Sequence, residues 1–298
     1  MIRVRVPAST SNLGSGFDCF GLALQLYLTV QMETTGRDLQ IHVAGEGCGE
    51  IPTNADNLIY KAFRLVFEKS PKSVPPVRIE IVNEIPLFRG LGSSGAAAIA
   101  GLVTGAKVAG INLNDCELLN LANQIEGHPE NAAASLYGGL TINCVENESV
   151  LTQKVPVSEK LKAVLFIPHR RISTEQARKV LPRTISHKDA VFNLQRSALL
   201  AHAFLTADFR FLNFAVQDKI HQPFRKKLIP GFDEIEQAGY DAGALAVCIS
   251  GSGSTVLGLC TKETAQLTAQ WQALANKLQI SAQILTVGID PKGVSFLN

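Results

Sequence analysis

A glycine-rich segment with two serines, residues 86–98, carries the residue types that bind a phosphate group. Gly90 and Gly92 can adopt backbone angles that other residues avoid, and they place no Cβ beside a ligand. Ser93 and Ser94 stand where we expect the N-cap of the small-residue helix that follows. The first N–H groups of that helix, together with its dipole, attract anions. The segment therefore predicts a nucleotide-binding loop.

The surroundings of this segment exclude the commoner nucleotide sites. Residues 90–95 satisfy G-x-G-x-x-G, but the predicted strand at 77–82 does not lead directly into the glycines, and a helix at 114–125 follows where a dinucleotide fold needs a strand. No G-x-x-x-x-G-K-[ST] occurs. The protein-kinase signatures are incomplete at His169-Arg170-Arg171 and at Asp208-Phe209-Arg210. A glycine-rich turn that only caps a packed helix stays open as the alternative.

Length and composition are compatible with many enzymes and exclude few classes. A chain of 298 residues suggests one large or two moderate domains. Its 46% hydrophobic and 18% charged residues are typical of globular proteins, and a net charge of +2 gives no reason to expect a nucleic acid. The six cysteines form no C-x-x-C pair, so we expect reduced thiols in the core.

The N-terminus alternates apolar and charged residues like a strand and does not resemble a signal peptide. No apolar run approaches the roughly 20 residues that span a bilayer. We therefore expect a cytoplasmic protein with no membrane partner.

Hydrophobic periodicity predicts strands mixed with segregated helices, which is typical of the α+β class. The predicted strands cover residues 2–6, 26–33, 39–43, 77–82, 140–144, 162–167, 244–249, 255–260 and 280–287. The predicted helices cover residues 57–68, 93–109, 114–125, 131–137, 174–181, 188–205 and 263–277. No internal repeat or low-complexity linker separates them.

Four segments, in the expected order, resemble the motifs of the GHMP kinases in the form that homoserine kinases have. Residues 6–24 resemble the first motif, residues 86–97 the second and residues 248–255 the third. Between them, Glu126-Gly127-His128-Pro129-Glu130-Asn131 followed by Tyr137-Gly138-Gly139 is similar to a segment typical of homoserine kinases. Because these matches extend over residues 1–260, the chain is identified as a member of this family.

The resemblance implies a two-domain fold and an activity. A ribosomal-protein-S5-like nucleotide domain would cover residues 1–160, and a ferredoxin-like domain would cover residues 161–298. The implied reaction is ATP-dependent phosphorylation of the side-chain hydroxyl of L-homoserine to O-phospho-L-homoserine, for threonine biosynthesis. The implied partners are ATP and L-homoserine, and a homodimer is compatible with the family.

The resemblance also places ATP and Mg²⁺. ATP would bind the glycine-rich loop and an asparagine before the first helix: Pro86, Leu87, Phe88, Arg89, Gly90, Leu91, Gly92, Ser93, Ser94, Gly95, Ala96 and Asn57. Ser94 and Glu126 would hold Mg²⁺, which favours one or two carboxylates together with substrate phosphates. Taken singly, Ser94 and Asn57 could be helix caps, and Glu126 could be a solvated acid at a helix end.

Homoserine is zwitterionic, so its site needs an anion and a guanidinium group. Asp18, with Asn12, suits the ammonium group. Arg178 and Arg225 match the homoserine kinase pattern and suit the carboxylate, because the planar guanidinium can bind both oxygens. Each arginine could equally be a surface charge. His128 either lines the pocket or forms a hydrogen bond within its loop.

Asn131 matches a region where related kinases have an aspartate thought to act as a base. An amide cannot accept a proton at neutral pH, so the resemblance implies transfer without a strong side-chain base. In that reading Asn131, Asp18, Arg178 and Arg225 form the catalytic set by positioning the acceptor. This is chemically reasonable because a largely dissociative transition state needs little activation of the nucleophile.

Three positions depart from the common pattern of the family: Gly95, Glu130 and Ser254. None of them removes a predicted ligand. Residues 250–253, in the third motif, are expected to pack against the substrate and phosphate site while joining two strands. A mevalonate-pathway kinase and a silent ligand-binding relative are the alternative functions. Mevalonate has no ammonium group, so a mevalonate-pathway kinase would not need Asp18. A silent relative would be expected to lack Ser94, Glu126 or the loop glycines, and all of these are present.

Overall fold

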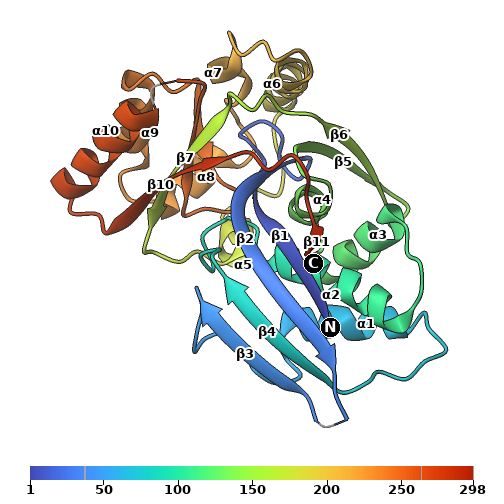
Figure 1. Ribbon diagram of the computed structural model, residues 1–298. Helices are drawn as coiled ribbons and strands as arrows, with labels where there is room; N and C mark the ends of the chain where they lie inside the picture. Colours follow the sequence, from blue (N-terminus) through green and yellow to red (C-terminus); the bar gives the residue numbers. More distant parts are fainter. Residues whose placement is uncertain (37, 263, 298) are drawn as a thin grey trace.

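The computed structural model describes residues 1–36, 38–262 and 264–297, which form two β-sheets with helices packed on them (Figure 1). Seven strands make the first sheet and four make the second. Strands and helices are mixed along the chain, the strands form two largely antiparallel sheets, and the predicted α+β class is confirmed.

The first sheet is built on two long antiparallel strands, β1 (Ile2–Ser11) and β2 (Phe20–Thr34). The strand order is β11-β1-β2-β4-β3, and β5 pairs with both β2 and β6. The further strands are β3 (Gln40–Gly45), β4 (Val77–Asn83), β5 (Leu140–Glu146), β6 (Ser149–Val155) and β11 (Ser295–Leu297). Because β11 pairs with β1, the two ends of the chain lie close together (Figure 1).

Four helices cover the first sheet, and α2 lies at their centre. They are α1 (Leu58–Phe67), α2 (Ser93–Ala109), α3 (Asp115–Glu126) and α4 (Glu130–Tyr137). Helix α2 packs against the other three helices and against β1. Nearly all of its side chains are apolar or small, and most are buried, as expected for a helix surrounded by protein. This packing fixes the position of its N-terminus, where the glycine-rich loop ends.

The second sheet is antiparallel, with the order β10-β7-β9-β8. Its strands are β7 (Lys162–Pro168), β8 (Ala246–Ile249), β9 (Val256–Cys260) and β10 (Ala282–Gly288). Helices α9 (Phe232–Asp241) and α10 (Thr264–Lys277) pack on it. Trp271 of α10 is fully buried, and its indole N–H donates to the carbonyl of Ile235 in α9 at 2.9 Å.

Between β7 and β8 of the second sheet the chain forms the long helix α6 (His187–Thr206) and several short helices: α5 (Thr174–Lys179), α7 (Leu212–Ala215), α8 (Gln222–Arg225) and the 3₁₀-helix η1 (Lys226–Leu228). Helices α6 and α7 place Leu200, Phe204 and Leu212 in the same apolar core as β1 and β2. The division between residues 160 and 161 stays a prediction, and this shared core crosses it.

Several expectations need correction. Strands β1 and β2 extend beyond 2–6 and 26–33, because the first motif itself forms their paired ends. Strand β6, helix α9 and strand β11 lay outside the predicted elements. The helix predicted over 263–277 starts at a residue, Glu263, that lies outside the described residues.

The expected core thiols are only partly found. Cys248 and Cys260 are buried, but Cys48, Cys116 and Cys144 are exposed. A single cysteine carries no pattern that indicates which face of its element it occupies. In the described ranges, none of the helices has both the length and the hydropathy of a bilayer-spanning segment.

Candidate active site

A cavity of about 540 Å³ opens between the first sheet, the N-terminus of α2 and segments that follow β7 and β8. Cavities of this size hold cofactors and small substrates. Its wall contains the predicted site residues Asn12, Asp18, Asn57, Pro86, Leu87, Phe88, Arg89, Gly90, Leu91, Gly92, Ser93, Ser94, Gly95, Glu126, His128, Asn131, Arg178 and Arg225. Residues from both halves of the chain thus meet at one place.

Ala96 is the predicted site residue that does not line the cavity. Its side chain is fully buried in the apolar core, and its N–H donates to the Gly92 carbonyl at 2.9 Å. By this point the helix satisfies its own N–H groups, so Ala96 has no donor left for a phosphate. We therefore remove it from the ATP site.

Glycine is required twice in the loop by close approach. Gly90 has φ 73°, and a Cβ there would lie 2.1 Å from the Ser250 carbonyl oxygen. Gly92 has φ 69°, and a Cβ there would lie 2.0 Å from Ser9 Oγ. The two glycines let the loop press against the first and third motifs at once.

The N-cap of α2 is Gly92, and neither serine caps the helix. Ser93 and Ser94 instead occupy the first helical turn. This corrects the expected N-cap, and the reason is the left-handed conformation of Gly92, which begins the helix without a capping side chain. The first N–H groups of α2 therefore remain available at the cavity wall for an anion.

Ser94 and Glu126 meet across the cavity, and the Ser94 hydroxyl donates a hydrogen bond to a Glu126 carboxylate oxygen. Glu126 is the last residue of α3, which packs on α2. Burial raises the pKa of Glu126 above its ordinary value, while the Ser94 hydrogen bond and His128 act in the opposite direction. Two hard oxygen donors beside the glycine-rich loop are of the type that Mg²⁺ prefers.

Asn131 is held by three hydrogen bonds on the cavity wall. Its side-chain oxygen accepts from Ser9 Oγ at 3.0 Å. Its amide nitrogen donates to Ser11 Oγ at 3.2 Å and to Glu130 Oε1 at 3.1 Å. Because Ser11 Oγ and Glu130 Oε1 can both accept, the nitrogen of the side-chain amide faces them. These hydrogen bonds fix the orientation of the Asn131 side chain.

His128 lies beside Glu130, with Nδ1 3.1 Å from Oε1. This is an ion-pair distance, although the direction of the N–H does not satisfy a hydrogen bond. Burial alone lowers the pKa of His128, but the carboxylates of Glu130 and Glu126 outweigh it, so the pKa is raised overall. Glu130 is 2% exposed, and its Oε2 lacks a hydrogen bond within the described part of the chain.

Asp18 and Arg178 pair with each other in the cavity. The guanidinium donates to both carboxylate oxygens, at 3.0 and 2.9 Å. Both side chains are about one-third exposed, at 36% for Asp18 and 38% for Arg178. The two groups assigned to opposite ends of a zwitterion are thus neighbours.

Arg225 differs from Arg178 in being almost completely buried, at 2% exposed. Its Nε donates to the Ala177 carbonyl at 3.2 Å, and its Nη1 donates to the Gly251 carbonyl at 3.0 Å. Burial lowers its pKa to about 10, so it stays cationic at neutral pH. A buried cation on a cavity wall is a strong candidate for binding an anion.

The third motif ties the site together. The Gly251 carbonyl accepts from Asn12 Nδ2 at 2.9 Å as well as from Arg225, and the Ser250 hydroxyl donates to the Gly90 carbonyl at 2.6 Å. Residues 250–255 also join β8 to β9, as expected, and Gly251 and Ser252 line the cavity, while the packing of this motif against substrate and phosphate stays a prediction. Asn12 accepts from the Asp18 N–H at 3.0 Å, and it therefore positions Asp18 and the third motif together.

Asn57 caps α1. Its side-chain oxygen accepts from the N–H groups of Ile59 and Tyr60, at 3.0 and 3.3 Å, and its amide donates to the Pro52 carbonyl at 2.8 Å. All of these groups are engaged within the protein. The role of Asn57 near adenosine stays a prediction, and its capping role is observed.

Substituting Asn57 with alanine is expected to lower the free energy of unfolding by about 1 kcal/mol, because the N-terminal N–H groups of α1 lose their acceptor. Equilibrium urea unfolding measures this effect. The matched variant Asn57→Asp keeps the acceptor and should lose less. We expect the KM for ATP to change less than about threefold in either variant; a large rise in that KM with unchanged stability would instead assign Asn57 to the nucleotide.

Sequence reasoning missed three features of the site. Ser9 and Ser11 hold Asn131, and Phe17 lies under both guanidinium groups, 5.7 Å from Arg178 and 5.0 Å from Arg225. All three residues belong to the first motif, and their place in it was the sequence feature that could have identified them. Their roles depend on partners more than 100 positions away in the sequence, as in the Ser9–Asn131 hydrogen bond.

Comparison with known proteins gives consistent results for both halves of the chain. The model of the GHMP kinase N-terminal domain matches residues 57–139, and that of the GHMP kinase C-terminal domain matches residues 200–276. A homoserine kinase of Desulfitobacterium hafniense is 38% identical over 300 aligned positions, which cover 100% of both chains. A homoserine kinase of Microchaete diplosiphon is 40% identical over 299 positions, covering 100% of this chain and 97% of that one.

A solved structure agrees with these relatives. The crystal structure of a homoserine kinase from Cytophaga hutchinsonii superposes with a TM-score of 0.90 and 28% identity. The match covers 99% of this chain and 97% of that chain, so the two chains share the same overall fold.

Proposed function

The chain belongs to the GHMP kinases and, among them, to the homoserine kinase family, and on this premise we propose that it phosphorylates the side-chain hydroxyl of L-homoserine with ATP. The product is O-phospho-L-homoserine, an intermediate of threonine biosynthesis. The residues that we assign to the nucleotide loop and to the acceptor site line one cavity of this two-domain GHMP kinase fold, which supports the proposal.

The observation that carries this proposal is the set of charges beside the phosphate loop. Asp18 offers a carboxylate to the ammonium group of the substrate, and Arg178 and Arg225 offer guanidinium groups to its carboxylate. Because Asp18 and Arg178 are already paired, a zwitterion can bind alongside them without leaving an isolated charge. An acceptor without an ammonium group would gain nothing from Asp18.

We assign the phosphates of ATP to the loop from Pro86 to Gly95 and to the first N–H groups of α2. Ser94 and Glu126 would hold Mg²⁺. The metal would neutralise charge on the transferring phosphoryl group. The protein then contributes mainly by holding the acceptor hydroxyl in line with that group.

Asn131 orients the acceptor hydroxyl in this proposal and takes no proton from it. Its fixed amide presents groups that can form hydrogen bonds but cannot be protonated at neutral pH. The hydroxyl proton leaves late, to phosphate or to solvent, as a largely dissociative transition state allows.

Substituting Asn131 with aspartate is expected to lower kcat about tenfold at pH 7.5, since one lost hydrogen bond and one repulsion cost about 1.4 kcal/mol. The repulsion arises because the new carboxylate would lie beside Glu130, whose Oε1 is 3.1 Å from the present amide nitrogen. Two adjacent carboxylates raise the pKa of one of them, so the variant should gain an ionisation in its kcat profile. Steady-state rates between pH 5 and 9 measure this, with the exposed Asn147→Asp as control.

The wild-type profile tests the proton path directly. If kcat fell tenfold per pH unit below a midpoint near 6–7, an essential base would exist and the proposed path would be wrong. The variant His128→Asn shows whether any such ionisation belongs to that histidine.

The overall activity is tested with purified protein, ATP and Mg²⁺, by measuring ADP release with homoserine, mevalonate or galactose as acceptor. We expect homoserine to be the efficient acceptor and mass spectrometry to detect O-phospho-L-homoserine. ADP release with mevalonate but not with homoserine would overturn the assignment, and release with none of them would favour a ligand-binding relative without activity.

A further inference from the structure

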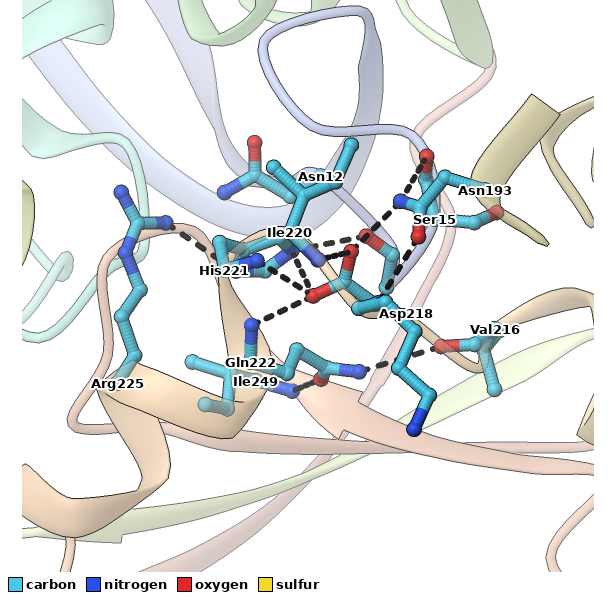
Figure 2. A network of polar contacts seen from close by, with 12 residues as sticks. Asn12, Ser15, Asn193, Val216, Asp218, Ile220, His221, Gln222, Arg225 and Ile249 are labelled. Carbon is cyan, nitrogen blue, oxygen red and sulfur yellow. Dashed lines mark hydrogen bonds and ion pairs between the residues drawn. The ribbon is translucent and has the colours of Figure 1, made fainter. Parts of the chain in front are cut away.

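His221 is a buried titratable residue that the reaction described above does not use. It is 0% exposed, and it lies behind Arg225, one helical turn before it. Its ring stacks on Phe17 with centroids 5.1 Å apart and planes 24° apart. Figure 2 shows it at the centre of a polar network that joins the first motif to α8.

The hydrogen bonds of His221 determine its tautomer. Nε2 lies 2.8 Å from the Gly14 carbonyl oxygen, which can only accept, so Nε2 carries a proton. Burial lowers the pKa of His221 to about 4, so the imidazole is neutral at neutral pH. Nδ1 is then unprotonated and accepts from Arg225 Nη1, which lies 3.4 Å away.

The imidazole is held rigidly. Asp218 accepts from the backbone N–H groups of Ile220, His221 and Gln222, at 2.9, 2.8 and 2.6 Å, and from the Asn193 amide at 2.7 Å. The charged groups that face His221 are Asp218, with Oδ2 3.7 Å from Nε2, and Arg225, with Asp18 beyond it. The ring therefore has little freedom to turn away from Arg225.

In the part of the chain that the structure describes, the contact with His221 leaves Arg225 with free N–H groups on one nitrogen only. The guanidinium has one N–H on Nε and two on each terminal nitrogen. Ala177 engages Nε, while Gly251 and His221 engage the two N–H groups of Nη1. Within the described ranges no acceptor is bonded to Nη2, and Arg225 lines the cavity, so both N–H groups of Nη2 remain for a ligand.

We propose that His221 is a positioning residue that acts through Nδ1 on Arg225, so that Nη2 faces the carboxylate of the amino-acid substrate. This inference rests on the proposed function for the identity of that substrate. His221 thereby couples the Gly14 turn of the first motif to recognition of the substrate carboxylate.

Two substitutions separate this role from packing. The variant His221→Asn places an amide oxygen near the position of Nδ1 and loses the bond to Gly14. The variant His221→Gln reaches Gly14 with its amide and loses the acceptor for Arg225. We expect the KM for homoserine to rise about tenfold in His221→Gln and less than about threefold in His221→Asn, with the KM for ATP unchanged.

A purely structural role makes a different prediction. The two variants would then show equal changes, or changes that follow their melting temperatures, and either result would overturn the proposal. His202, an exposed histidine on α6, supplies the control His202→Gln.

A second measurement tests whether the effect passes through the substrate carboxylate. 3-Aminopropan-1-ol is homoserine without its carboxylate. The ratio of kcat/KM for homoserine to kcat/KM for this analogue should fall about tenfold in His221→Gln relative to the wild type. An unchanged ratio would overturn the role of His221, whereas a wild type that does not phosphorylate homoserine would overturn the proposed function instead.

A third measurement needs no folded variant at this position. The ¹H–¹⁵N spectrum of the wild-type imidazoles at pH 7, with the His202→Gln spectrum as an aid to assignment, should show His221 protonated at Nε2 and unprotonated at Nδ1. A proton on Nδ1 would overturn the proposal, because that nitrogen could not then accept from Arg225.

Discussion

Replacing Glu126 with glutamine is expected to lower kcat about a thousandfold, equivalent to about 4 kcal/mol of transition-state stabilisation. The carboxylate lies beside Ser94 at the N-terminus of α2, where the phosphates of ATP are assigned. Glutamine has the same shape but no charge, so it would hold Mg²⁺ poorly. Phosphoryl transfer measured over a range of Mg²⁺ concentrations should therefore show a low kcat that high Mg²⁺ only partly restores.

The control for this prediction is Glu146→Gln, at an exposed position of β5. It should leave kcat and the Mg²⁺ dependence unchanged. If Glu126→Gln kept kcat within tenfold of the wild type, with the same Mg²⁺ dependence, Glu126 would not be a metal ligand. The KM for homoserine should change little in either variant, because the charges assigned to that substrate lie on other residues.

Replacing Arg225 with lysine is expected to lower kcat/KM for homoserine by a factor of about 100 to 1,000, since an unpaired buried carboxylate costs about 3–4 kcal/mol. Arg225 is 2% exposed and is fixed by the Ala177 and Gly251 carbonyls. Lysine is a point charge on a flexible stem and cannot reproduce those bonds while facing the substrate. Initial rates at varied homoserine and saturating ATP measure the loss.

Arg178 offers the comparison. Its side chain is 38% exposed, and it is paired with Asp18, so water and that carboxylate reduce its contribution. We expect Arg178→Lys to lower kcat/KM only about tenfold. The exposed Arg183→Lys should have no effect. Equal losses in the Arg225 and Arg178 variants would contradict the assignment of the buried arginine as the main carboxylate ligand.

The phosphate loop shows how far local sequence reasoning reaches. Glycines and serines at residues 90–95 predict an anion site because backbone freedom and free N–H groups are local properties. The same reasoning misplaced the N-cap, which is Gly92, and the family resemblance included Ala96, which is buried. Both outcomes depend on which residue begins α2, because that residue determines which side chains of the helix face the core. Composition does not determine where the helix begins.

The charged side chains show where local reasoning stops. Asp18 and Arg178 are identified as candidates by their motifs, but their bidentate pairing across 160 positions depends on how the first motif meets α5. The burial of Arg225 and its contact with His221 likewise require the Gly14 turn, α8 and the third motif to come together. Neither the hydrophobic periodicity nor the spacing of motifs along the chain predicts these contacts between distant segments.

The sequence by itself determined the class of the fold, the loop proposed to bind phosphate and the residue types proposed for the acceptor site, because each depends on short patterns and on side-chain chemistry. Only the tertiary structure decided which arginine is buried and which is paired with Asp18, and that His221 and Arg225 lie in contact. The physical reason is that burial and pairing arise from packing between distant segments. The strength of an electrostatic interaction depends on that packing more than on the charges themselves.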